Sequence, residues 1–151
     1  MSDRMSASVL KDLIEWYEHL APERIDEVSA YYADDARFVD PFNDVIGIAA
    51  IAGIFRHMFE QVDAPRFKVE QVFDNGSAAM LVWRFEFLLG GKARGFQGAT
   101  ELQFDALGKV LLHKDYWDPA RELYEKLPVV GAFLRWLARR LAAPVAGNAR
   151  R

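Results

Sequence analysis

Two aspartates stand where a carboxylate could exchange a proton with a bound molecule. Asp40 ends the short apolar run "RFVD" and precedes Pro41, and Asp115 lies in the middle of "VLLHKDYWD", two residues after His113. An apolar neighbourhood disfavours a charged carboxylate and brings its pKa toward the range in which it can act as an acid or a base. Asp40 can equally be a turn residue at the end of its strand. His113 can orient Asp115 or be a hydrogen-bonded core histidine.

Arg84 and Glu86 form a second charged group in the segment "SAAMLVWRFEFLL". Residues two apart on a strand share a face, so both side chains point to the same side. Inside a pocket, the arginine would favour the charged form of one carboxylate, and two carboxylates would be split into an acid and a base. The alternative is a structural ion pair in solvent. We predict a catalytic set of Asp40, Arg84, Glu86, His113 and Asp115.

The elements that must position these side chains follow from hydrophobic periodicity. Apolar residues recur at helical spacing from Ser8 to Leu20 and over residues 47–61, and Pro22 begins another helix that extends to Tyr32. Residues 37–40 form a short strand. From Pro65 onward, alternating segments separated by "DNG", "GG" and "DALGK" predict four long antiparallel strands. The sequence predicts an α+β domain: a cone-shaped, curved antiparallel sheet with three N-terminal helices that enclose an apolar pocket.

The long strand poses a question of orientation. Trp83, Phe85 and Phe87 share one face, and alternation alone makes that face the core. The other face carries Arg84 and Glu86 but is otherwise apolar, and a strand that is apolar on both faces is covered on both. We therefore predict the reverse arrangement, in which a homodimer covers the aromatic face and the charged face lines the pocket.

Composition bounds the class of protein. The 151 residues suffice for one domain, and the net charge of −3 does not suggest a nucleic-acid partner. The chain has no cysteine and only three histidines, so we expect no metal site and no cofactor. The N-terminus lacks the apolar core of a signal peptide, and the charge-free run over residues 45–55 is too short to span a bilayer. A cytoplasmic protein is expected.

The C-terminal segment differs from the rest of the chain. We expect residues 1–118 to form the cone and residues 119–151 to add an amphipathic helix and tail to the same domain. The segment carries seven basic and two acidic residues, a charge of +5 that leaves −8 on the rest of the chain. Such a helix with Trp136 can contact an anionic membrane surface. We favour the alternative that it caps the cone or packs on a partner subunit.

Two motifs, "YADDARFVDPF" and "HKDYWDPA", resemble the nuclear transport factor 2-like superfamily. This superfamily includes ketosteroid isomerases, SnoaL-like cyclases and limonene epoxide hydrolases, and the resemblance covers roughly residues 10–119. It implies a cone around an apolar pocket, commonly in a dimer. Carried over by position from ketosteroid isomerases, Asp40 matches the catalytic base. The oxyanion-hole tyrosine falls on Trp16, with Tyr17 beside it, and the protonated aspartic acid falls on Thr100.

The last strand carries a second match. "HKDYWD" resembles SnoaL-like proteins, whose acid/base aspartate falls on Asp115. Limonene epoxide hydrolases place an aspartate there too, coupled to an Arg-x-Asp that reads Arg84–Phe85–Glu86 in this chain. In that chemistry one carboxylate takes a proton from water, the other protonates the epoxide oxygen, and the arginine holds both.

These residues lead to two functional expectations. The first is a SnoaL-like or ketosteroid isomerase-like protein that binds a small apolar molecule and performs cofactor-free isomerisation, cyclisation or epoxide hydration. The second is a non-catalytic ligand-binding or dimeric assembly domain. In either case the expected pocket walls are Trp16, Tyr17, Phe38, Phe42, Phe55, Met58, Thr100 and Trp117.

Overall fold

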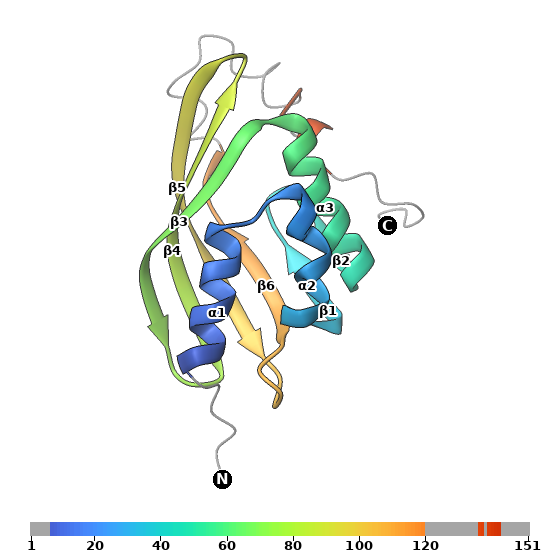
Figure 1. Cartoon of the computed structure of the whole chain (residues 1–151), viewed down its shortest axis with the longest axis vertical. Coiled ribbons are helices and arrows are strands. Elements are labelled where there is room, and N and C mark those ends of the chain that lie inside the picture. The colour runs from blue at the N-terminus through green and yellow to red at the C-terminus, as the bar shows by residue number, and fades with distance from the viewer. Residues whose placement is uncertain (1–6, 120–135, 138, 143–151) are drawn as a thin grey trace.

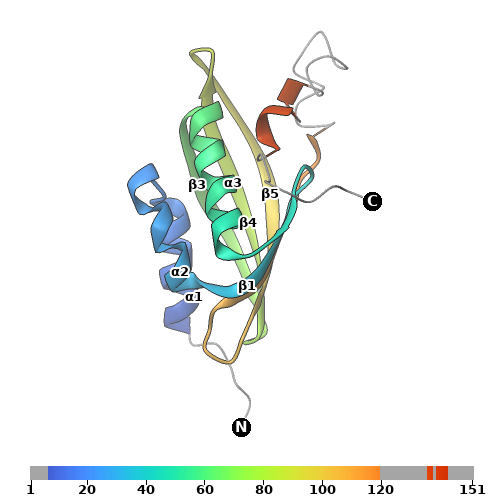
Figure 2. The same ribbon diagram turned by 90° about the vertical axis from the view of Figure 1, so that its right-hand side faces the viewer.

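The computed structural model describes residues 7–119, 136–137 and 139–142. The helical elements are α1 (Ala7–Glu18), a 3-10 helix η1 (Pro22–Glu27), α2 (Val28–Tyr31) and α3 (Ile48–Gln61). The strands are β1 (Tyr32–Val39), β2 (Asp44–Ile46), β3 (Asp63–Asp74), β4 (Ala78–Leu89), β5 (Lys92–Phe104) and β6 (Val110–Tyr116). The helices lie on one side of a curved sheet (Figure 1; Figure 2). The predicted α+β class and cone are confirmed.

The six strands form one sheet in the order β2-β1-β6-β5-β4-β3. The predicted meander of four antiparallel strands, β3 to β6, is confirmed. The sheet is nevertheless mixed, because β6 pairs with β1 in parallel. The chain leaves β1, passes through β2, α3 and the strands β3 to β5, and returns as β6 along β1 in the same direction. The prediction of a wholly antiparallel sheet is therefore wrong at this pair, which joins the two predicted motifs.

The predicted helices are confirmed with changed boundaries. In α1, the helical spacing buries Leu10, Leu13, Trp16 and Tyr17. The predicted second helix is instead a 3-10 helix followed by one α-helical turn, because the chain is already extended at Tyr32. Strand β1 is accordingly longer than predicted. The three-residue strand β2 was not expected from the sequence.

Strand β4 faces the opposite way from our prediction. Its side chains Trp83, Phe85 and Phe87 are buried within this one chain, whereas Arg84 and Glu86 form an ion pair of 3.1 Å with side chains 48% and 60% exposed. Burying an aromatic side chain removes on the order of 150–250 Å² from water, while burying an ion pair incurs a large desolvation cost. The helices can cover only one face of β4. Covering the aromatic face yields the larger gain in free energy, so that face is the buried one. A homodimer remains a prediction, but not through these rings.

The ring of Trp83 lies over Gly98, its partner across the β4–β5 pair. A Cβ atom built on Gly98 would lie 2.6 Å from Cζ2 of Trp83. Only a residue without a side chain allows the indole to lie flat on β5 here. The glycine therefore fixes the position of a ring that also reaches the functional site described below.

We predict that Gly98→Ala lowers the free energy of unfolding by about 1–3 kcal/mol, since the indole must move or clash. Urea denaturation measures this difference. Gly53→Ala is the matched control: Gly53 lies inside α3, and a methyl group added there would meet no atom of another element within 4 Å. Helix propensity should therefore make that variant more stable by up to about 1 kcal/mol. Equal effects of the two substitutions would contradict the packing described for Trp83.

Most of the C-terminal segment lies outside the described residues. Its described part includes Leu137, which is buried, and Leu141, whose carbonyl oxygen accepts a 3.4 Å hydrogen bond from Nδ2 of Asn43. The segment thus contacts the turn after β1. The predicted domain boundary at residue 118 and the contact with a membrane remain predictions. Within the described residues, no helix has the length and apolar character needed to cross a membrane.

Candidate functional site

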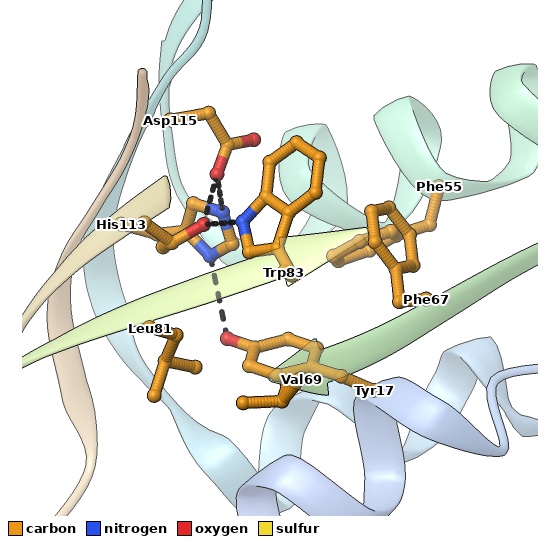
Figure 3. A pocket seen from close by; sticks show the side chains of 9 residues that line it. Tyr17, Phe55, Phe67, Val69, Leu81, Trp83, His113 and Asp115 are labelled. Carbon is orange, nitrogen blue, oxygen red and sulfur yellow. Dashed lines mark hydrogen bonds and ion pairs between the residues drawn. The ribbon is translucent and has the colours of Figure 1, made fainter. Parts of the chain in front are cut away.

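A cavity lies between the inner face of the sheet and helices α1 and α3 (Figure 3). It encloses about 390 Å³ of empty space when its mouth is included, and the centres of water-sized molecules can occupy about 40 Å³. Because the first volume includes open solvent, the second limits what the cavity can hold: about three or four waters. The lining residues are Tyr17, Phe55, Phe67, Val69, Leu81, Trp83, Thr100, His113 and Asp115.

Asp115 is the acidic residue of this cavity. Its side chain is 17% exposed, and one carboxylate oxygen, Oδ1, accepts hydrogen bonds from Thr100 Oγ1 at 2.5 Å and from His113 Nε2 at 2.8 Å. Its other oxygen, Oδ2, has no hydrogen-bond partner among the described residues. One oxygen thus fixes the side chain, and the other remains available to a ligand.

The neighbouring strands hold this carboxylate in place. Thr100 on β5 pairs directly with Asp115 on β6, so its hydroxyl lies beside the carboxylate. Trp83 Nε1 in turn donates a 2.7 Å hydrogen bond to Thr100 Oγ1, and Thr100 donates its own proton to Asp115. The hydroxyl is thereby bonded on both sides, and its orientation is fixed.

His113 connects Asp115 to two buried tyrosines. The hydroxyl of Tyr32 lies 2.7 Å from His113 Nδ1, the hydroxyl of Tyr17 lies 3.3 Å from the same atom, and the two hydroxyls are 2.5 Å apart. Burial raises the pKa of both phenols well above their usual range, so they stay protonated. If Tyr17 donates to Tyr32, Tyr32 to Nδ1, and Nε2–H to Asp115, every proton of the chain finds an acceptor. We therefore assign a neutral imidazole with its proton on Nε2.

Asp40 adopts the turn role that the sequence left open. Its Oδ1 accepts hydrogen bonds from the backbone N–H groups of Phe42 at 2.8 Å and Asn43 at 2.6 Å, and the Asn43 side chain contacts both carboxylate oxygens at 3.1 Å. Burial raises the pKa of Asp40, the hydrogen bonds from Asn43 and Phe42 lower it, and the nearby charge of Asp115 raises it further. Asp40 is absent from the cavity wall, so the structure favours a structural role.

The five residues of the predicted catalytic set are only partly brought together. His113 and Asp115 share one hydrogen bond in the cavity wall. Arg84 and Glu86 lie on the opposite, solvent-exposed face of the sheet, and their predicted inward orientation is wrong. The Arg-x-Glu group therefore cannot bridge carboxylates in this cavity.

Only some of the predicted wall residues line the cavity. Tyr17, Phe55 and Thr100 line the cavity, as expected. The others pack elsewhere: Trp16 is fully buried and donates to the carbonyl of Arg24, Phe38 stacks on His113, Phe42 and Trp117 contact each other, and Met58 packs against the core. Phe38 still supports the site, because its ring lies 4.4 Å from the imidazole that holds Asp115.

Sequence reasoning missed four wall residues and one member of the hydrogen-bonded chain. Phe67, Val69, Leu81 and Trp83 come from the inner faces of β3 and β4, and the reversed orientation of β4 hid them. The alternation of the strands contained the necessary signal. Tyr32 was assigned to a helix end and carried no signal as a partner of His113.

The architecture and the cavity define a cone-shaped domain of the nuclear transport factor 2-like type. A family model described as a SnoaL-like domain matches residues 13–113. The chain belongs to this SnoaL-like family. No curated protein sequence matches the chain.

Solved structures of several relatives share the fold. A protein of ketosteroid isomerase-like fold from Catenulispora acidiphila DSM 44928, in complex with trimethylamine, is 13% identical over 79% of this chain and 92% of its own, with a TM-score of 0.67. An LEH-like epoxide hydrolase of M. tuberculosis is 19% identical over 91% and 94%, with a TM-score of 0.64. A protein assigned as a SnoaL-like polyketide cyclase from Jannaschia sp. CCS1 is 14% identical over 79% and 91%, with a TM-score of 0.67.

Asp40 should make stability depend on pH in a defined direction. Its pKa in the folded state lies above the ordinary value of 3.8, so the folded state binds this proton more tightly than the unfolded state does. The contribution of this proton to the free energy of unfolding is fully present below pH 3.8 and is lost as the pH rises through the pKa of Asp40 in the folded state. We predict that the unfolding free energy of the native protein minus that of Asp40→Asn falls as the pH rises.

Chemical denaturation of both proteins from about pH 3 to about pH 8 measures this difference. Asp34→Asn, which removes an exposed carboxylate from the preceding strand β1, is the control for the general effect of losing one negative charge. A difference for Asp40→Asn that grows with pH would mean that hydrogen bonds outweigh burial at this carboxylate.

Proposed function

We propose that this SnoaL-like protein catalyses cofactor-free proton transfer on a small, largely apolar molecule, with Asp115 as the acid and base. The observation that supports the proposal is the division of labour between the two oxygens of Asp115: Oδ1 is fixed by Thr100 and His113, and Oδ2 has no partner among the described residues. A general base must keep one lone pair within reach of the substrate proton, and a fixed carboxylate with one unoccupied oxygen meets that need.

In the proposed reaction, Oδ2 takes a proton from the substrate and returns it at another atom. The ionised carboxylate is the form that can accept the proton, and the two hydrogen bonds to Oδ1 stabilise that form. His113 and Thr100 act as positioning residues, since they contact Asp115 at Oδ1. The side chains of Phe55, Phe67 and Trp83 surround the site of proton transfer with apolar aromatic walls.

Proton transfer at carbon, as in isomerisation or cyclisation, is favoured over epoxide hydration. The epoxide chemistry implied by the family resemblance needs an arginine that holds two carboxylates. In this chain Arg84 and Glu86 point to solvent on the other face, and no arginine of the described residues lines the cavity. A single carboxylate can still move a proton between two carbons.

Non-catalytic ligand binding is the second candidate, and one observation favours it. Isomerisation creates negative charge on an oxygen, which a catalyst stabilises with hydrogen-bond donors. The N–H and O–H groups of Trp83, Thr100, His113 and Tyr17 already find acceptors within the site. A binding protein needs no such free donor.

We predict that Asp115→Asn lowers the rate of proton exchange by on the order of 100-fold or more, because asparagine cannot accept the proton. The probe is 3-cyclopenten-1-one in D₂O, a small cyclic ketone whose α-protons are followed by NMR. Asparagine retains an acceptor oxygen for Thr100 and His113, so the fold should persist, which circular dichroism verifies.

Glu86→Gln is the matched control, since it removes a carboxylate from the exposed face of the sheet and should leave the rate unchanged. Equal exchange by the native protein and Asp115→Asn would exclude Asp115 as the base. Absence of exchange with the native protein, together with measurable binding of the ketone, would favour the non-catalytic candidate.

A further inference from the structure

We infer that the cavity preferentially binds a small alkylammonium ion, whose N–H donates to Oδ2 of Asp115 and whose alkyl groups contact the aromatic walls. The inference rests on the same placement of Oδ2 as the proposed function, but it requires binding only and no turnover.

The hydrogen bonds within the cavity wall favour a ligand that carries a hydrogen-bond donor. Trp83 donates to Thr100, Thr100 and His113 donate to Asp115, and the hydroxyl of Tyr17 bonds to that of Tyr32. The donors of these wall residues are therefore occupied, while Oδ2 of Asp115 is an acceptor without a partner in the described residues. A ligand that offers only acceptors finds no unoccupied donor among these wall residues and is held by apolar contacts alone.

The charge of the cavity wall favours a ligand whose hydrogen-bond donor is positively charged. Asp115 is the acidic residue of the wall, and none of the lysines or arginines in the described residues lines the cavity. Arg84, the cation that sequence analysis placed here, lies on the outer face. With His113 neutral, the cavity keeps an uncompensated negative charge. A cationic ligand removes this charge imbalance, whereas an anionic ligand adds to it.

The walls suit a cation whose charge is surrounded by alkyl groups. Tyr17, Phe55, Phe67 and Trp83 contribute four aromatic rings, and Val69 and Leu81 contribute aliphatic contacts. The negative faces of aromatic rings attract ammonium groups, with Trp the strongest, and clusters of such rings recognise alkylated amines. The same rings accept methyl groups by apolar contact, so the ligand need not be strongly hydrated.

The volume of the cavity limits the size of the ligand. The 40 Å³ available to the centres of water-sized molecules corresponds to only a few waters. This volume suits a compact amine with short branches and excludes a polycyclic ligand unless side chains move. The expected ligand is thus a primary to tertiary amine in its ammonium form with a few carbon atoms.

Three probes of nearly the same shape test the inference: tert-butylammonium, tert-butanol and trimethylacetate, which carry a positive charge, no charge and a negative charge. Binding to the full chain is measured by ligand-observed NMR and by titration calorimetry at neutral pH and low salt. We expect tert-butylammonium to bind at least about tenfold more tightly than tert-butanol, and trimethylacetate to bind most weakly.

Two variants locate the preference. Asp115→Asn keeps the size of the side chain but removes its charge, and it should reduce the preference for the cation over tert-butanol to about onefold. Glu86→Gln removes an exposed carboxylate from the other face and should leave the preference intact. If the preference persists in Asp115→Asn, or falls equally in both variants, the cation is attracted by the overall negative charge of the protein, and the inference fails.

The native protein alone also decides the matter, so the test does not depend on a variant that folds. Equal or tighter binding of tert-butanol overturns the inference. Failure of this inference is distinguishable from failure of the proposed function: proton exchange without a preference for the cation rejects the ligand class only, whereas a clear preference without exchange rejects catalysis only.

Discussion

The structure of the site depends on the two hydrogen bonds that hold Oδ1 of Asp115. Thr100 donates from the neighbouring strand and His113 donates from the same strand, so both sheet pairing and side-chain alternation are needed to form it. Behind these donors lie Trp83, Tyr32 and Tyr17, each with its polar atom satisfied. A carboxylate held this way has one oxygen for structure and one for a ligand.

The same residues build the core and the site. Trp83 packs on Gly98 and contacts the rings of Phe67 and Phe96, yet its indole N–H orients Thr100. His113 stacks on Phe38 while it holds Asp115. Because core side chains themselves hold the functional groups, substitutions in the core should displace the carboxylate, and substitutions in the site should lower stability.

Periodicity was enough to predict the helices, the meander and the placement of His113 and Asp115 on one face of the last strand. Alternation alone pointed to the aromatic face of β4 as the inner one, but Met80, Val82 and Leu88 make the outer face almost as apolar, and this led to the opposite prediction. That choice depends on tertiary packing, where three aromatic rings outweigh a few aliphatic residues and an ion pair. The role of Asp40 was equally undecided, since a turn and a pocket can both follow a strand that ends in Asp-Pro.

The protonation of His113 tests the central claim most directly, because it reports on both ends of the hydrogen-bonded chain at once. Two-dimensional ¹H–¹⁵N NMR of the histidine ring at neutral pH distinguishes the two nitrogens. We predict a neutral ring with its proton on Nε2, toward Asp115, and an unprotonated Nδ1 that accepts from the hydroxyl of Tyr32. A proton on Nδ1, or rapid averaging between both forms as in a solvent-exposed histidine, would contradict it.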